Sequence, residues 1–325
     1  MTIDAHILSM LRAHRDGISG EEISHQTGIS RAAVWSRIEA LRALGFDIAA
    51  NPHQGYRLID TPDCLVAADL LARTDKALVI GRDIRVVDQA ESTNDLADEM
   101  ARDGLPEGTV IFADTQTHGR GRMGRSWSSV PGKGLWFSVI LRPALSPTET
   151  TRLTAAAAIA LVRAIRAETG LAADIKWPND ILLNNRKAAG ILIELHADLD
   201  RVQHVILGIG INVHHNTSDF PSALRQIATS LKLAGARQPS RPALAARVLN
   251  ELDCDYNRIL RGQFSLVAEE WTRHCGTLGQ TVTLTRGDQT LRGRAEAIDE
   301  QGALLLRTEH GRLESVLSGD LTPAP

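Results

Sequence analysis

The stretch Gly119-Arg-Gly-Arg-Met-Gly-Arg125 decides between two classes of fold. It matches G-x-G-x-x-G, the dinucleotide fingerprint, which requires a strand before it, a helix after it and an acidic residue about twenty positions on. Here the next apolar run, Leu135–Leu141, is strand-like, and no acidic residue appears before Glu149. This context argues against a nicotinamide-binding, doubly wound parallel sheet.

The same loop carries Arg120, Arg122 and Arg125 on a glycine-rich backbone. Glycines let backbone N–H groups converge on anionic oxygens, and arginines add forked, permanently charged donors. Such a loop suits a carboxylate, a phosphate, or both brought together. The alternative interpretation is a solvated basic surface loop.

Around this loop, strand-like and helical runs alternate over residues 63–275. The expected strands are Ile84–Val87, Thr109–Ala113, Leu135–Leu141, Asp174–Trp177, Ile181–Leu183, Gly190–Leu195 and Val205–Val213. The expected helices are Thr93–Arg102, one near Thr151–Thr169 and one near Pro242–Leu260. Hairpin-like spacing at Asn184-Asn185 favours a mixed sheet in an α+β domain.

Residues 1–62 have the element order of a winged helix-turn-helix. Ser19-Gly-Glu-Glu22 is a capping-box pattern, Gly28 allows a sharp turn, and Ser30 can cap a longer helix. A hairpin follows, with a turn at Asn51-Pro52. On the recognition helix and wing, the expected DNA-facing residues are Arg31, Ser36, Arg37, His53 and Gln54.

The charge of this first part is unusual for a DNA-binding domain. Residues 1–60 hold six arginines and seven acidic residues, a net charge of −1. An inert or protein-binding helical module is therefore the alternative, although the element order favours DNA binding. Residues 276–325 are short, turn-rich and strand-like, which predicts a small barrel.

Composition sets the remaining bounds. The 325 residues are 43% hydrophobic with a net charge of −3, so the chain can build a large core, and any nucleic-acid contact must be local. No apolar run reaches the length of a membrane span.

Three cysteines without Cys-x-x-Cys spacing predict neither a disulfide framework nor a zinc site and suit a reducing cytosol. The histidines form no recognisable ligand set, and the adjacent His214 and His215 would point to opposite faces of a strand.

Three further motifs carry charged or amide side chains beside strands. They are Lys176-Trp-Pro-Asn-Asp180, Arg186-Lys187-Ala-Ala-Gly190 and Gly208-Ile-Gly-Ile-Asn212. Lys176 could face phosphate and Asp180 could hold magnesium, although an ion pair at a strand end is the simpler interpretation. The glycines of the third motif indicate a ligand or a second backbone packing closely.

Taken in order, these motifs resemble the biotin–protein ligases. The loop with nearby Trp127, then KWPND, RKAAGILIEL and GIGINV, follow the family pattern. The helix-turn-helix and the C-terminal barrel, of the SH3-like type, resemble the bifunctional bacterial form, a biotin ligase and biotin operon repressor. The resemblance covers nearly the whole chain.

The resemblance implies two half-reactions at one site. Biotin's carboxylate attacks the α-phosphate of ATP, giving biotinyl-5′-AMP and pyrophosphate, and a lysine of a biotin carboxyl carrier protein then takes the biotinyl group and releases AMP. Magnesium is implied with ATP, and the repressor form implies operator DNA, a homodimer on ligand binding and a cytoplasmic location. The resemblance gives no membrane partner.

The resemblance also assigns residues. For biotin it implies Ser92, Thr93, Asn94, Gln116, Arg120, Gly121, Arg122, Trp127 and Lys187. For ATP or the adenylate it implies Arg122, Arg125, Lys176, Asn179 and Asn212, with Asp180 at the metal. Arg122 and Lys187 are expected to stabilise the developing charge. Helix capping by Ser92 and core packing by Trp127 are the alternative roles.

One position departs from the pattern. Met123 stands where the bacterial repressor type carries a further arginine, which removes one donor from the loop. Two other functions stay open on the sequence: a biotin-sensing repressor without ligase activity, and a ligase for a related acid such as lipoate. The Ser-Thr-Asn set suits a ureido ring better than a dithiolane.

Overall fold

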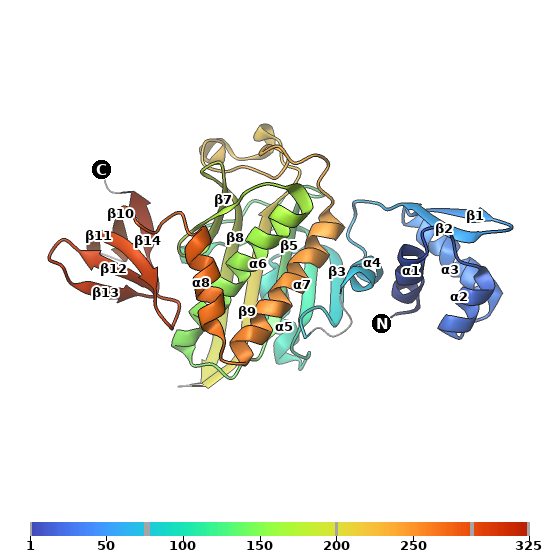
Figure 1. Ribbon diagram of the computed structural model, residues 1–325, viewed down its shortest axis with the longest axis horizontal. Helices are drawn as coiled ribbons and strands as arrows, with labels where there is room; N and C mark the ends of the chain where they lie inside the picture. Colours follow the sequence, from blue (N-terminus) through green and yellow to red (C-terminus); the bar gives the residue numbers. More distant parts are fainter. Residues whose placement is uncertain (1, 75–78, 199–200, 287–288, 324–325) are drawn as a thin grey trace.

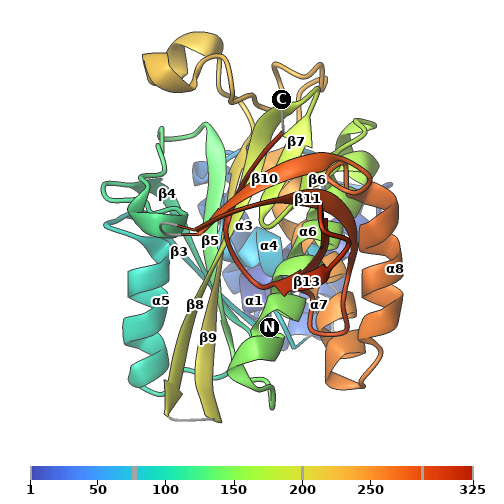
Figure 2. The same ribbon diagram turned by 90° about the vertical axis from the view of Figure 1, so that its left-hand side faces the viewer.

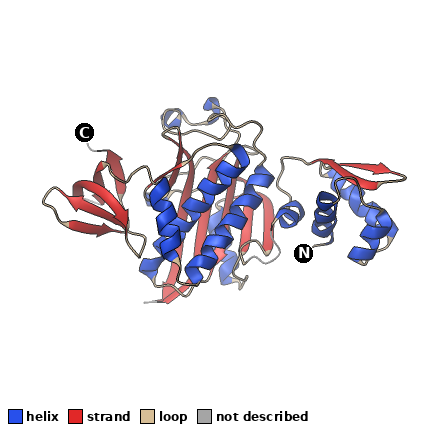
Figure 3. Cartoon of the chain, in the orientation of Figure 1, coloured by secondary structure: helices blue, strands red, loops and turns tan. Residues whose placement is uncertain are grey.

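The computed structural model describes residues 2–74, 79–198, 201–286 and 289–323. Three parts lie in a row along the longest axis (Figure 1). A mostly helical N-terminal part and a strand-only C-terminal part flank a central sheet with its helices (Figure 3). This arrangement follows the predicted order of a helix-turn-helix, a mixed-sheet domain and a small β domain.

The N-terminal part is a winged helix-turn-helix, as predicted. Its elements are α1 (Ile3–Ala13), α2 (Gly20–Thr27), α3 (Arg31–Ala43), β1 (Asp47–Asn51) and β2 (Gly55–Asp60). Ser19 Oγ accepts a hydrogen bond from the Glu22 N–H at 3.0 Å, and Ser30 Oγ accepts one from the Ala33 N–H at 3.2 Å. Gly28 ends α2 at a φ of 70°, a conformation that glycine adopts without strain.

A short helix joins this part to the centre. α4 (Ala67–Arg73) was not predicted, and its Ala68 and Ala72, with Val66 just before it, pack against the core of the N-terminal part. Asp69 of α4 is 1% exposed and accepts hydrogen bonds from both Arg12 and Arg73. A buried carboxylate is tolerated only when it is paired, so Asp69 ties α1 to α4 through Arg12.

The central domain holds a seven-stranded mixed sheet. Its strands are β3 (Asp83–Ala90), β4 (Thr109–Gln116), β5 (Gly134–Leu141), β6 (Asp174–Lys176), β7 (Asp180–Leu183), β8 (Arg186–Asp198) and β9 (Arg201–Asn212). The order is β3-β4-β5-β9-β8-β7-β6, with only β3 and β4 parallel. The mixed sheet confirms the expectation from Asn184 and Asn185, which turn between β7 and β8 at φ values of 50° and 61°.

Helices cover both faces of this sheet. They are α5 (Thr93–Arg102), α6 (Thr151–Thr169), α7 (Arg241–Leu260) and α8 (Phe264–His274). Figure 2 shows α5 on one side of the sheet and α6, α7 and α8 on the other. The small side chains of α6, mostly alanine, are buried, which lets the helix lie close to the sheet and to α7. Among the described helices, none is both long and apolar enough to cross a bilayer.

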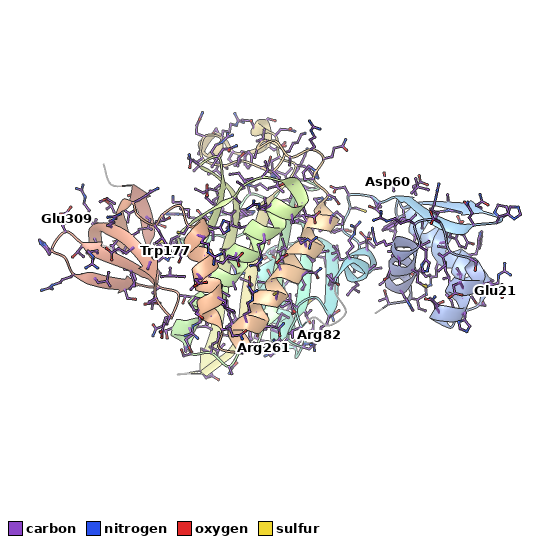
Figure 4. All side chains as sticks on the ribbon, viewed as in Figure 1. Glu21, Asp60, Arg82, Trp177, Arg261 and Glu309 are labelled. Carbon is purple, nitrogen blue, oxygen red and sulfur yellow. The ribbon has the colours of Figure 1, made fainter. Side chains whose placement is uncertain are left out.

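The C-terminal part is a five-stranded antiparallel sheet. Its strands are β10 (Thr281–Arg286), β11 (Gln289–Ile298), β12 (Leu304–Thr308), β13 (Leu313–Val316) and β14 (Asp320–Pro323). The order β13-β12-β11-β10-β14 places β13 and β14 at opposite edges, so the described pairing supports the sheet but not the closed barrel that was expected. Trp177, labelled in Figure 4 between the central and C-terminal parts, donates its backbone N–H to Thr277 Oγ1 at 3.2 Å.

Candidate active site

One cavity of about 590 Å³ lies where the central sheet meets the C-terminal part. It is bounded by the start of α5, the loop after β4, the ends of β6 to β9 and the first residues of β14. Every residue that the sequence assigned to biotin, nucleotide or metal lines it: Ser92, Thr93, Asn94, Gln116, Arg120, Gly121, Arg122, Arg125, Trp127, Lys176, Asn179, Asp180, Lys187 and Asn212.

A buried polar network holds the first residues of α5. Ser92, Thr93 and Asn94 are each less than 5% exposed. Gln116 Oε1 accepts from the Thr93 N–H at 2.7 Å, and Ser138 Oγ lies 2.8 Å from Thr93 Oγ1 and 2.6 Å from Asn94 Oδ1. These partners fix which atoms each polar side chain presents to the cavity, which suits recognition of a ring with both donors and acceptors.

Ser92 does not act as a helix cap through its side chain, since that side chain makes no capping hydrogen bond to α5. The capping alternative that the sequence left open therefore receives no support here. The hydroxyl lies in the cavity wall instead.

The glycines of β8 and β9 make room for two side chains. A Cβ on Gly208 would lie 2.2 Å from Asn94 Oδ1, and one on Gly210 would lie 2.7 Å from Trp127 Cε2. A Cβ on Gly190 would lie 2.9 Å from the same indole, at Cζ3. The sequence predicted a ligand or a second backbone against these glycines, whereas the close neighbours are two side chains, the amide of Asn94 and the indole of Trp127.

The three arginines of the loop have different surroundings. Arg120 is ion-paired with Asp95 and Glu194, and Arg125 with Asp320. Arg122 donates to Asn179 Oδ1 at 3.2 Å, and no described carboxylate lies within 4 Å of its guanidinium. Burial lowers the pKa of Arg122, but an arginine stays charged at neutral pH. Arg122 is therefore the loop arginine without a carboxylate in direct contact among the described residues, although Asp320 and Asp180 act on its charge from further away.

Lys187 extends into the cavity from the start of β8. Its Nζ lies 2.6 Å from Asp180 Oδ1 and 5.4 Å from the centroid of a Trp127 ring. The simpler interpretation of Asp180, an ion pair at a strand end, holds with a different partner, because Asp180 pairs with Lys187 and not with Lys176 of its own motif. Trp127 is partly exposed and faces a cation, so it forms a wall of the cavity as well as packing on the glycines.

The remaining predicted residues also line the cavity. Asn179 Nδ2 donates to the Ile191 carbonyl at 2.8 Å, and Asn212 Nδ2 donates to the Thr229 carbonyl at 3.0 Å. Lys176 pairs with Asp180 in the register of β6 and β7, so both lie at one edge of the sheet. The peptide bond between Trp177 and Pro178 is cis.

Sequence reasoning missed three residues that organise the site. Ser138 and Glu194 hold Asn94, because Asn94 Nδ2 donates to Glu194 Oε2 at 2.7 Å. Asp320 comes from β14 and brings the C-terminal part to the arginine loop. A single hydroxyl inside the apolar strand Leu135–Leu141 was a signal for Ser138, whereas nothing near Asp320 in the sequence marked it.

The expected DNA-facing residues lie on the exposed side of α3 and at the wing tip. Arg31, Ser36 and Arg37 are exposed, as are His53 and Gln54 between β1 and β2. Arg37 Nη1 lies 3.5 Å from Asp4 Oδ2 of α1. An exposed pair of this kind is weak and leaves Arg37 able to exchange Asp4 for another anion.

The chain is similar to known protein families and to individual proteins in them. Residues 86–212 match the biotin/lipoate A/B protein ligase family, residues 5–57 an HTH domain, and residues 277–321 the biotin protein ligase C-terminal domain. The bifunctional ligase/repressor BirA of Bacillus subtilis (strain 168) is 40% identical over 310 residues, 95% of each chain. The protein of that name from Escherichia coli (strain K12) is 30% identical over 99% of this chain and 97% of its own.

A solved structure from the same family is also similar in fold to this chain. The biotin protein ligase from Aquifex aeolicus, in complex with biotin and ATP, superposes with a TM-score of 0.64 at 27% identity, covering 75% of this chain and 100% of that one. The match over nearly the full length of the curated relatives includes the N-terminal helices as well as the cavity. The chain therefore belongs to the biotin protein ligase family, in the form that begins with a helix-turn-helix domain.

Proposed function

We propose that this protein is an ATP-dependent biotin–[acetyl-CoA-carboxylase] ligase that also represses transcription. The observation that carries the ligase function is one cavity in which Arg122 and Lys187 stand beside the polar set Ser92–Asn94. Two cations and a set of directed donors and acceptors suit a ligand that has an anionic end and a neutral polar end. Family membership supports biotin as that ligand and ATP as its partner.

The proposed chemistry begins with two anions that repel each other. An oxygen of the biotin carboxylate attacks the α-phosphorus of ATP, the bond to the pyrophosphate oxygen breaks, and biotinyl-5′-AMP forms. Arg122, whose charge has no carboxylate partner among the described residues, offsets the repulsion and stabilises the charge that develops on phosphorus. Holding both reactants in one cavity supplies further acceleration.

Lys187 has a second role in this proposal. Its ammonium is paired with Asp180, so a phosphate that binds here replaces one anionic partner by another. In the second half-reaction, the ε-amine of a lysine on a biotin carboxyl carrier protein attacks the acyl carbon. The bond to AMP breaks, the amine loses a proton, and Lys187 stabilises the charge on the acyl oxygen.

Magnesium is proposed with ATP. Two carboxylates are among the residues that line the cavity, Asp180 and Asp320, and Mg²⁺ is usually held by one or two carboxylates together with substrate phosphates. Both carboxylates are ion-paired, Asp180 with Lys187 and Asp320 with Arg125, so the ion would share Asp180, the residue expected to hold it, with Lys187 or displace the lysine toward the phosphates. Bound magnesium would neutralise part of the phosphate charge.

The repressor function rests on the N-terminal part. We propose that α3 enters the major groove of an operator with Arg31, Ser36 and Arg37, and that two copies bind a two-fold site as a homodimer when biotinyl-5′-AMP is present. A repressor must reach chromosomal DNA, so the proposed location is the cytoplasm. We divide the chain into residues 1–62 for DNA, 63–275 for ligation and 276–325 for a C-terminal domain of the SH3-like barrel type.

The deciding experiment is biotin-dependent exchange of labelled pyrophosphate into ATP, followed by transfer of labelled biotin to a carrier domain. Both reactions are expected with pure protein, biotin, ATP and magnesium. Pyrophosphate exchange without biotin transfer would contradict the proposed ligase and favour a biotin-sensing repressor. Biotin binding without exchange or transfer would do the same. Because the matching family also includes lipoate ligases, lipoate is run in parallel, and preference for lipoate would contradict the proposed substrate.

A further inference from the structure

Two histidines and an aspartate meet on the face of the central sheet that α5 covers. His196 of β8 and His204 of β9 are direct partners in the antiparallel register, so both side chains project from the same face. Asp98 of α5 lies over them, and Figure 2 shows α5 alongside the β8–β9 hairpin. None of the three residues lines the ligand cavity.

The ring nitrogens of both histidines point to one oxygen atom. His196 Nδ1 lies 2.9 Å and His204 Nε2 lies 2.8 Å from Asp98 Oδ1. The two imidazoles are stacked, with centroids 4.7 Å apart and 13° between their planes. The three ligand atoms all lie within 4.8 Å of one another. Two imidazoles and one carboxylate oxygen are the donor set of many transition-metal sites.

The other carboxylate oxygen has its own partner. Arg102 Nη2 lies 2.8 Å from Asp98 Oδ2, one turn further along α5. The arginine therefore orients the carboxylate and leaves Oδ1 for the histidines. Groups that orient a ligand in this way are regular parts of metal sites.

We propose that Asp98, His196 and His204 form a binding site for one divalent transition-metal ion of the zinc class. The ion binds the lone pairs of His196 Nδ1, His204 Nε2 and Asp98 Oδ1, and each neutral ring moves its proton to its other nitrogen. With zinc bonds of about 2.0–2.2 Å, ligand atoms in a tetrahedral site lie about 3.3 Å apart. The distance from each ring nitrogen to Asp98 Oδ1, now 2.8–2.9 Å, must therefore increase slightly to admit the ion. His196 can supply this movement, since it is 48% exposed, while His204 is 3% exposed and fixed.

The ion would fasten α5 to the β8–β9 hairpin. α5 begins with Thr93 and Asn94 in the ligand cavity and carries Asp98 one turn later. Three protein ligands leave a fourth position for water, which the exposure of His196 keeps open. The site is thus separate from the proposed magnesium position at Asp180, and its donor set of two imidazoles and one carboxylate discriminates against magnesium.

The test is titration of the tag-free full chain with zinc chloride in competition with a chromophoric zinc chelator. The wild type is expected to bind one zinc ion, and His196→Gln to weaken that binding by at least about tenfold. His214→Gln is the matched control, because His214 also contacts a carboxylate, Asp63, but has no second histidine there among the described residues. The metal-free His196→Gln variant should unfold at the same temperature as the wild type and keep its pyrophosphate exchange.

A second measurement needs no variant. X-ray absorption of the zinc-loaded wild type should show nitrogen and oxygen ligands with the signature of two imidazoles at about 2.0–2.1 Å. Equal zinc binding by wild type and His196→Gln, absence of binding at micromolar zinc, or a spectrum without two imidazoles would each overturn the proposal. Neither titration nor spectrum depends on biotin or ATP, so failure here leaves the proposed ligase untouched.

Discussion

Lys187 Nζ and Asp180 Oδ1 lie 2.6 Å apart in the wall of the cavity, so the structure pairs the lysine with a carboxylate of its own chain. The two residues lie on neighbouring strands, Lys187 near the start of β8 and Asp180 as the first residue of β7. A phosphate or acyl-phosphate oxygen entering the cavity competes with Asp180 for this ammonium. The pair therefore holds the lysine extended in the cavity wall.

Lys187→Ala is expected to slow biotin-dependent pyrophosphate exchange and transfer by about 10²–10³-fold, the usual cost of removing one charge-stabilising donor. The fold should persist, because Lys187 is at the cavity surface. Lys232→Ala is the control, since Lys232 is exposed and does not line the cavity. Exchange rates measured at saturating biotin and ATP check the prediction, and wild-type turnover in Lys187→Ala would remove this residue from the mechanism.

Gly208→Ala is expected to weaken biotin binding at least about tenfold. The new Cβ would lie 2.2 Å from Asn94 Oδ1, so the amide must leave Ser138 and Glu194, and a buried hydrogen bond costs about 1–3 kcal/mol when one partner is left unsatisfied. Calorimetric titration with biotin measures the effect. Gly276→Ala serves as control, because its nearest neighbour would be at an ordinary 3.8 Å. An equal loss of biotin affinity in Gly208→Ala and Gly276→Ala would contradict a specific role of Asn94.

His215 is expected to make stability depend on pH. It is 1% exposed, stacks on Phe220 and has no described hydrogen-bond partner at either ring nitrogen. Burial lowers the pKa of His215 from 6.5 to about 4. Between pH 4 and pH 6.5 the imidazole is therefore protonated in the unfolded state and neutral in the folded state. The free energy of unfolding is therefore unaffected by His215 above pH 6.5 and decreases by about 3 kcal/mol as the pH falls from 6.5 to about 4.

The variant His215→Phe should lose this part of the slope of unfolding free energy against pH. Urea unfolding of wild type and variant at several pH values between 4 and 7 measures it. His53→Gln, at the exposed wing tip, should retain the wild-type slope. A wild-type slope in His215→Phe would assign the pH dependence to other groups.

Deletion of residues 1–62 is expected to abolish operator binding and leave biotinylation detectable. The cut exposes Val66, Ala68 and Ala72, which pack on the removed core, and leaves Asp69 without Arg12. We therefore expect the truncated protein to aggregate more readily than a version that also carries Val66→Ser. Labelled-biotin transfer and a mobility-shift assay measure the two functions. Loss of ligation in both truncated versions would show that the two parts do not separate at this boundary.

Local patterns predicted the fold where a few neighbouring residues determine the structure. The bounds of α5 and α6 agree with the sequence, and the turn at Asn184 and Asn185 agrees because asparagine adopts positive φ at low cost. α4 and α8 were missed. α4 has only seven residues, and its apolar side chains serve two parts of the chain at once, so its periodicity is weak.

The site was predictable where motifs were continuous and not where distant segments meet. The arginine loop and the lysine motif stand out in the sequence, and the structure brings them to one cavity. Asp320 reaches the loop from 195 residues away, and the cluster of His196 and His204 depends on strand register. No local pattern records such contacts, which is why the histidines suggested no ligand set.

The indole of Trp127 rests on two neighbouring strands at Gly190 and Gly210. In any descendant of this chain, either glycine can acquire a side chain only after the tryptophan has been replaced by something smaller. Side chains at Gly190 or Gly210 should accordingly occur only in sequences that carry a smaller residue at position 127. A library that randomises all three should recover functional combinations that single substitutions never reach.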